Sequence, residues 1–239
     1  MATLLLVRHG RTTANASGVL AGRSPGVQLD EVGSTQAAQV GQRLSELPLS
    51  RLVSSPLVRC RQTGAAIVSR QSAPPEERTD SSITECGYGS WTGEPLKNLA
   101  RHPLWKTVQS QPSAVTFPDG EAMQQMQARA VAGVRRHDAE VEAEHGPDAL
   151  WVAVSHGDVI KAVLADALGL HLDLFQRIVV DPGSVSVVRY TRGRPFVVHL
   201  NDHGTDLTPL RPPKRRRRRA TSDAPVGGGA GAARRGRTS

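Results

Sequence analysis

The sequence predicts an α/β domain: a three-layer αβα sandwich with a mostly parallel central sheet, followed by a disordered basic C-terminal tail. Two continuous apolar runs, Thr3–Val7 and Trp151–Val154, are typical of strands covered on both faces. Segments with helical spacing separate the strand-like runs, and this alternation favours a sheet with helices on both sides. We expect the domain to span residues 1–205 and the tail to span residues 206–239.

The helices are predicted from apolar spacing and from residues that start or stop a helix. Pro48 ends the first, and Pro56 is well placed in the first turn of the second, which follows a short strand at Leu52–Val53. The longest predicted helix precedes the apolar strand near residue 151, and the last one ends at Gly169. The four predicted helices, in chain order, are Gly33–Leu47, the helix that Pro56 opens, Glu121–Glu144 and Asp158–Leu168.

The last two strands are predicted to form a hairpin. Val185–Thr191 and Phe196–Leu200 are strand-like, and the short Arg192–Arg194 segment with its central glycine joins them. The chain is long enough for one sizeable domain, and its two cysteines are too few for a disulfide framework, so we expect reduced thiols. No signal peptide and no apolar run of about 18 residues is visible, which predicts a cytoplasmic protein without a membrane span.

The net charge of +8 is concentrated at the C-terminus. From Arg211 onward there are ten basic residues and one acid, which is +9 and leaves −1 for residues 1–210. The near-neutral body argues against nucleic-acid binding as the main function. The run Lys214–Arg219 can make weak, nonspecific contacts with polyanions through phosphates, but it has no interleaved aromatic residues for base stacking.

Chemically active side chains follow the predicted strands where each one ends. His9-Gly10 follows the first strand and His156-Gly157 follows the one near residue 151, while Arg59 and Arg61 belong to the helix after the second strand. Ligands of open α/β sheets bind beyond the carboxyl ends of the strands. Two imidazoles and two guanidiniums in one crevice suit a phosphate, because arginine forks match its oxygens and glycine allows close approach of the backbone.

Four ordered blocks resemble the histidine phosphatase superfamily, which includes the cofactor-dependent phosphoglycerate mutases. The resemblance covers residues 3–200 and also includes Gly22 and the Leu29–Gly33 segment. The four blocks are Leu6–Gly10 with Thr12 and Asn15, Ser54–Thr63, Ile83–Glu85 with Tyr88-Gly89 and Trp91–Gly93, and Val154–Gly157.

The resemblance implies a role for each matching residue. His9 would be the nucleophile that forms a phosphohistidine, with Arg8, Arg59 and His156 clamping the phosphoryl oxygens. Glu85 would protonate the leaving alcohol and then deprotonate water. The resemblance also places further residues at the phosphate or substrate: Asn15, the amide of Gly157, Gly22, Tyr88 and Lys97. No metal and no cofactor are implied.

Departures from the mutase pattern favour a phosphatase. The segment between Glu85 and His156 is short for a phosphoglycerate mutase and lacks the adjacent arginine pair that holds a substrate carboxylate in those enzymes. Arg135-Arg136 is an adjacent pair, but it lies within the long predicted helix, where we expect it at the surface. Residues 117–121 instead resemble a turn of the phosphatase branch. We therefore expect a metal-independent phosphomonoesterase that acts on a small phosphorylated metabolite.

Two other functions stay open at this point. One is a phosphomutase of the cofactor-dependent phosphoglycerate mutase type, which would need a site closed to water. The other is a catalytically idle scaffold or a nucleic-acid-associated protein acting through the basic tail. The sequence does not rank the candidate substrates, and a homodimer is expected only because dimers are common in the family.

Overall fold

The central sheet of the computed structural model has six strands in the order β3-β2-β4-β1-β5-β6. The structure describes residues 2–204, 226, 227 and 229. β1 and β2 pair in parallel with β4, and β3 pairs in parallel with β2, whereas β5 and β6 run antiparallel at the other edge. The strands are β1 Thr3–Arg8, β2 Leu49–Ser54, β3 Glu76–Thr79, β4 Leu150–Ser155, β5 Val185–Arg189 and β6 Phe196–Asp202.

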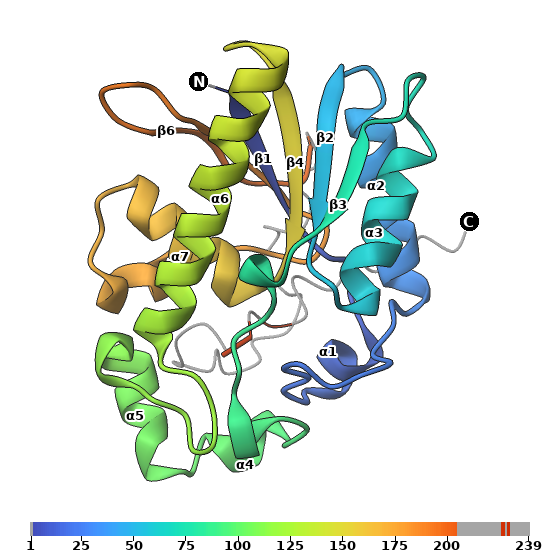
Figure 1. The fold of residues 1–239 in the computed structure, drawn as a ribbon. Helices are drawn as coiled ribbons and strands as arrows, with labels where there is room; N and C mark the ends of the chain where they lie inside the picture. The colour runs from blue at the N-terminus through green and yellow to red at the C-terminus, as the bar shows by residue number, and fades with distance from the viewer. Residues whose placement is uncertain (1, 205–225, 228, 230–239) are drawn as a thin grey trace, which may run out of the picture.

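Helices cover both faces of this sheet, as the sequence predicts. In Figure 1, α2 and α3 lie on one side of the strands while α6 and α7 lie on the other. The shorter helices α1, α4 and α5 lie beyond the carboxyl ends of the strands. The helices are α1 Thr13–Ser17, α2 Glu31–Leu44, α3 Val58–Val68, α4 Leu96–Leu99, α5 Pro103–Ser110, α6 Met123–His145 and α7 Gly157–Ala167.

Alternate side chains of the buried strands supply two separate cores. Leu4 and Leu6 of β1 point into the larger core, which contains the apolar side chains of α6 and α7. Leu5 and Val7 point to the opposite face and join the core beneath α2 and α3. Each large apolar side chain that is fully buried contributes about 1.5–3 kcal/mol. The continuous apolar composition of β1 therefore reflects burial on both faces of the sheet.

The predicted helices and the hairpin are confirmed, with shifts at their ends. α3 begins at Val58, so Pro56 precedes the helix instead of lying in its first turn. α2 begins at Glu31 rather than Gly33, because the Asp30 side chain accepts a hydrogen bond from the Gly33 amide at 2.7 Å and caps the helix. β3 was not predicted, because its residues Glu76-Glu77-Arg78-Thr79 are charged or polar. This strand forms at the sheet edge, where backbone pairing with β2 needs no apolar side chains.

The strand order places the three motif-bearing strand ends next to one another. β4 lies between β1 and β2, with Arg8 opposite Ser155 and Ser54 opposite Val154. All three strands are parallel, so their carboxyl ends lie at the same edge of the sheet. His9 and His156, which each follow the last residue of a strand, are thereby brought to one crevice.

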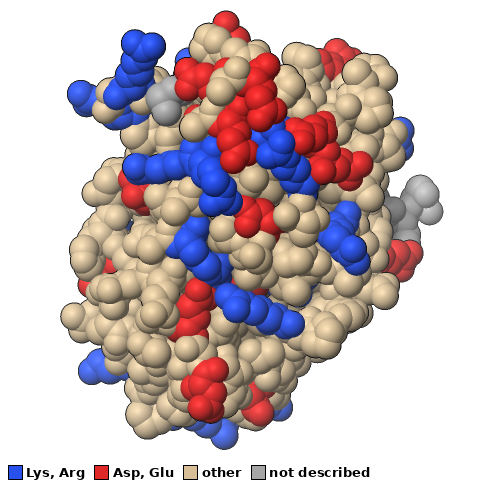
Figure 2. Space-filling model, viewed as in Figure 1, with Lys and Arg blue, Asp and Glu red and all other residues tan. Residues whose placement is uncertain are grey.

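The surface of the described domain carries mixed charge. Figure 2 shows acidic and basic side chains intermixed on the face that carries α6, rather than a patch of one sign. Part of this mixture is an ion-pair network in which the buried Arg51 contacts Glu76, Glu140 and Glu144. Among the described residues, no helix combines the length and the apolar composition that a membrane crossing requires.

Candidate active site

His9 is held in one tautomer by its own backbone neighbour. The Nδ1 atom lies 2.7 Å from the carbonyl oxygen of Gly10, which can only accept a hydrogen bond, so Nδ1 carries the proton. The Nε2 atom therefore keeps its lone pair. Burial, followed by the nearby guanidiniums of Arg59 and Arg8, holds the pKa of His9 well below its ordinary value of 6.5. The imidazole is neutral and able to act as a nucleophile at neutral pH.

Arg59 connects the two histidines. Its Nε donates to Nε2 of His9 at 3.2 Å, and its Nη2 lies 3.2 Å from Nδ1 of His156. Nη2 also donates to the carbonyl oxygen of Gly22 at 2.7 Å. This glycine has a φ of 51°, and a Cβ at that position would lie 2.8 Å from the Thr92 hydroxyl, so only glycine fits the turn that presents its carbonyl.

His156 is fixed from its far side by Ser55. Because Nδ1 accepts from Arg59, the proton of the neutral ring lies on Nε2, which is 2.7 Å from the Ser55 hydroxyl oxygen. Burial and the charge of Arg59 lower the pKa of His156 well below 6.5. The rings of His9 and His156 lie edge to face with their centres 5.2 Å apart. A small anion placed between them would meet both rings.

Glu85 brings a carboxyl group to the same pocket. Its Oε1 accepts from the Cys86 amide at 2.9 Å, and its Oε2 lies 3.9 Å from Nδ1 of His156. Burial and the negative charge of Asp158 raise the pKa of Glu85 to about 7, although Arg59 and Arg8 oppose the shift. A carboxyl that is half protonated near neutral pH is suited to give a proton and take one back.

The backbone around Glu85 is held by Arg129 of α6. The Arg129 Nη1 donates to the carbonyls of Ser82 and Thr84 at 2.7 and 2.8 Å, and its Nη2 donates to the Glu85 carbonyl at 3.1 Å. Glu121 fixes the guanidinium through both carboxylate oxygens. The turn at residues 117–121 thus braces the segment that carries Glu85.

Arg8 and Arg59 both keep a buried donor without a partner among the described residues. These donors are Nε of Arg8 and Nη1 of Arg59. An unsatisfied buried donor is costly, and a charged one more so. The other donors of Arg8 contact backbone carbonyls: Nη1 that of Val180 at 2.8 Å, and Nη2 those of Gly229 and Gly227 at 2.8 and 3.2 Å.

The arrangement is a buried neutral imidazole with an unprotonated Nε2, beside cationic donors and a carboxyl of raised pKa. The residues that form this arrangement lie in the part of the sequence that matches a known protein family. Residues 4–203 match the sequence profile of the Histidine phosphatase superfamily (branch 1). The chain belongs to this superfamily.

Relatives within the superfamily carry two kinds of name. A Yersinia pestis protein named "Probable phosphoglycerate mutase GpmB" is 30% identical over 192 residues, which is 80% of this chain and 86% of that protein. Fructose-2,6-bisphosphatase TIGAR of Xenopus tropicalis is 34% identical over 129 residues. That alignment covers 53% of this chain and 46% of the relative, so the match spans about half the length of TIGAR.

The fold also matches solved structures of phosphatases. A mycobacterial glucosyl-3-phosphoglycerate phosphatase, described in complex with VO3, superimposes with a TM-score of 0.73 at 24% identity. The match covers 83% of this chain and 98% of that one. At this identity the likeness establishes the shared fold.

Most of the superfamily positions predicted from the sequence come together in the structure. His9, Arg59, Glu85, Asn15 and Gly22 line one pocket, and His156 and Arg8 are buried beside it. Asn15 is fixed by the Thr12 amide and hydroxyl, which both donate to its Oδ1. Gly157 is the first residue of α7, where its amide is one of the free donors of the helix N-terminus.

Three predicted residues lie elsewhere. Tyr88 is fully buried, and its hydroxyl donates to Asp158 at 2.7 Å instead of lining the pocket. Lys97 lies exposed on α4, where its neighbour Leu96 reaches the pocket. Arg61, which was expected to supply a second guanidinium, is exposed on α3, and Arg8 supplies that charge instead.

Ser55 and Asp158 are parts of the site that were not predicted from the sequence. Ser55 lies inside the second family block, so its place before Pro56 was a usable signal for a contact with the crevice. Asp158 was assigned only as the first residue of a helix. Its complete burial, its two donors Tyr88 and Gly227 and its effect on Glu85 become visible only in the folded chain.

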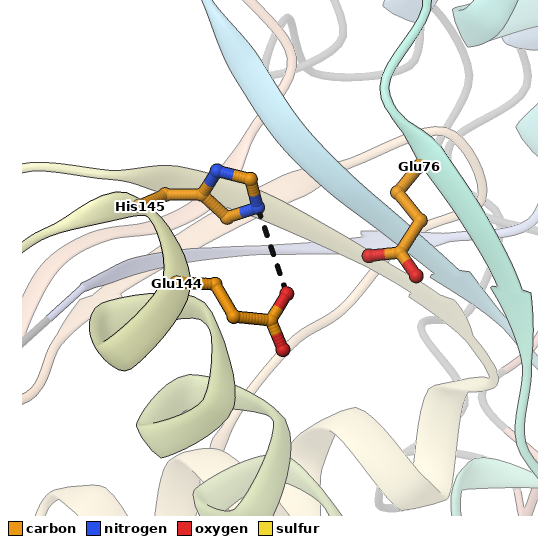
Figure 3. A group of neighbouring side chains, drawn as sticks. All are labelled: Glu76, Glu144 and His145. Carbon is orange, nitrogen blue, oxygen red and sulfur yellow. Dashed lines mark ion pairs between the residues drawn. The ribbon is translucent and has the colours of Figure 1, made fainter.

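One set of described side chains could place three metal-ligand atoms together, and it is remote from this pocket. Figure 3 shows Glu76 beside Glu144 and His145, at the opposite end of the sheet from the strand ends that carry His9 and His156. All three side chains are exposed. Both carboxylates already bind the Arg51 guanidinium at 2.7 Å, so they serve the ion-pair network.

Proposed function

We propose that the chain is a metal-independent phosphomonoesterase that hydrolyses a small phosphorylated metabolite through a phosphohistidine on His9. The observation that carries this proposal is the unprotonated Nε2 of His9, whose lone pair accepts a hydrogen bond from the cationic Arg59 in a buried pocket. Arg8 and Arg59 each have one buried N–H donor without an acceptor among the described residues, and a phosphate oxygen would accept from it.

In the first step, Nε2 of His9 attacks phosphorus and forms the P–N bond. The bond between phosphorus and the ester oxygen breaks, and the leaving oxygen takes the proton of Glu85. Arg59 and Arg8 donate to the phosphoryl oxygens, where the charge of the transition state is spread, and the His156 ring lies beside them. The Gly10 carbonyl stabilises the positive charge that develops on the ring, because it accepts from Nδ1.

In the second step, water attacks the phosphohistidine on the same phosphorus. The Glu85 carboxylate takes a proton from this water, the P–N bond breaks, and inorganic phosphate leaves with His9 neutral again. Glu85 therefore returns to its acid form at the end of each cycle. A pKa near 7 supports both roles, since neither proton state is strongly disfavoured.

A phosphomutase is the second candidate, and the similarity to GpmB over most of the chain favours it. A mutase would return the phosphoryl group from His9 to a substrate hydroxyl instead of to water. It would use the same first step and the same acid. The two functions differ only in what reaches the phosphohistidine, so the assay must follow both products.

The test is phosphate release from a panel of phosphomonoesters in EDTA, with isomerisation of 3-phosphoglycerate followed in parallel. We expect phosphate release that needs no metal, disappears in His9→Ala and leaves an acid-labile phosphohistidine in quenched reactions. Isomerisation without release would establish the mutase. If the wild type neither releases phosphate nor isomerises 3-phosphoglycerate across a broad panel, this would contradict the proposed reaction.

A further inference from the structure

A short segment from the C-terminal region lies at the active site. Val226, Gly227 and Gly229 are more than 20 residues beyond Gly204 in the sequence, yet they line the same pocket as His9 and Glu85. Figure 1 shows this segment beyond the carboxyl ends of the strands. It therefore occupies the region where the sheet presents its ligand-binding residues.

The segment is anchored by an apolar side chain. Val226 is only 2% exposed and belongs to the larger core together with Leu20 and Tyr88. Gly227 follows in the left-handed region with a φ of 75°, and a Cβ there would lie 2.9 Å from Leu20 Cδ1. The docked backbone thus needs glycine at this position, both for its conformation and for its close approach to Leu20.

The backbone of the segment binds two groups at the back of the site. The Gly227 amide donates to Asp158 Oδ2 at 2.9 Å. The carbonyls of Gly227 and Gly229 accept from Nη2 of Arg8 at 3.2 and 2.8 Å. Arg8 directly precedes His9 and is fully buried. A donor that is held by two peptide carbonyls is not free for a phosphate oxygen.

We propose that the segment around Gly227 is an intramolecular competitor for the phosphate of the substrate. The inference rests on the proposed function, because it assigns Arg8 to phosphate binding. A peptide carbonyl is a weaker acceptor for a guanidinium than a phosphate dianion, so substrate displaces the segment at a cost. Its covalent attachment keeps the competitor at a high effective concentration. The expected result is a raised KM with an unchanged kcat.

The first test is steady-state hydrolysis of p-nitrophenyl phosphate by the full chain and by Gly227→Val. Valine is strained at positive φ and meets Leu20, so it should release the segment. We expect KM to fall about tenfold with kcat within about twofold, the effect of a docked fraction near nine-tenths. Gly193→Val is the matched control, because this glycine is exposed in the β5–β6 turn.

A second pair of variants removes the apolar anchor. Val226→Asp places a charge in the core contact and should lower KM as Gly227→Val does, whereas Val198→Asp alters an exposed valine of β6 and should not. An unchanged KM in both tail variants would overturn the inference. A raised KM would also overturn it, since the segment would then be a wall of the substrate site.

A third measurement does not depend on turnover. Hydrogen exchange of the Gly227 amide should be slowed about tenfold in the wild type, because Asp158 accepts from it in the docked nine-tenths of the molecules, and orthovanadate should remove this protection. Orthovanadate should bind about tenfold more tightly to Gly227→Val than to the wild type. If the Gly227 amide stays protected from hydrogen exchange when vanadate is bound, or if vanadate does not bind, the inferred competition would be overturned. Competition without hydrolysis of any ester would instead contradict only the proposed reaction.

Discussion

The Nε of Arg59 lies 3.2 Å from Nε2 of His9 and donates to the lone pair that would attack phosphorus. This hydrogen bond has to break before a P–N bond can form. The guanidinium can then turn its donors to the phosphoryl oxygens, where negative charge collects in the transition state. The same side chain thus keeps the nucleophile neutral before substrate binds and stabilises charge during transfer.

Arg59→Lys should lower kcat/KM by about 10²–10³, since an ammonium cannot contact His9, His156 and a phosphoryl oxygen together. The measurement is steady-state hydrolysis of the preferred phosphomonoester. Arg61→Lys is the matched control on the same helix, because Arg61 is exposed, and it should stay within about twofold of the wild type. Equal losses in the two variants would contradict the role given to Arg59.

Glu85→Gln should impair hydrolysis of alkyl phosphates much more than hydrolysis of p-nitrophenyl phosphate. Nitrophenolate is a stable leaving group that needs no proton, whereas an alkoxide does, and general acid catalysis contributes about 10²–10⁴. For alkyl phosphates the rate of formation of the phosphohistidine should also fall as pH rises through about 7, where Glu85 loses its proton. Rapid-quench assays across pH 5–9 measure this, and a loss of equal size for both leaving groups would remove Glu85 as the acid.

The raised pKa of Glu85 also makes stability depend on pH. The folded state holds this proton up to about pH 7, whereas the ordinary value of 4.5 describes the unfolded chain. Stability from this group is therefore complete below about pH 4.5 and is lost as pH rises through 7, by about 3 kcal/mol in total. The Glu85→Gln variant has no carboxyl group at this position, so its stability does not contain this pH-dependent contribution. Urea unfolding of both proteins at pH 5, 6, 7 and 8 should show the wild type losing stability relative to the variant, and parallel curves would contradict the shift.

Arg129 should matter for turnover although it does not line the pocket. Arg129→Met removes the donors that hold the carbonyls of Thr84 and Glu85, so the carboxyl should lose its orientation. We expect kcat on alkyl phosphates to fall about 10–100-fold, with a smaller loss on p-nitrophenyl phosphate. Arg135→Met on the exposed side of α6 is the control and should have little effect. A loss that is the same for both substrates would indicate a purely structural role for Arg129.

Much of the fold could be predicted because the buried strands have an unusual composition. The apolar runs of β1 and β4 identified the two central strands, and the motifs at their ends identified the crevice. β3 could not be predicted, since an edge strand made of charged residues is defined by its pairing partner. The bounds of α2 shifted because a local capping contact by Asp30 decides where the helix begins.

The site was predictable as a set of residues but not as a geometry. The sequence by itself determined that His9, Arg59, Glu85 and His156 occur in ordered blocks, with the two histidines directly after predicted strands. This could be predicted because the pattern of neighbouring residues indicates where strands and helices occur along the chain. Only the tertiary structure decided the tautomer of His156, the exposure of Lys97 and the burial of Tyr88 on Asp158. The docking of Gly227 on Arg8 is likewise a contact between residues more than 200 positions apart. Hydrogen-bond direction, burial and charge proximity depend on which distant segments pack together, and that information arises only when the chain has folded.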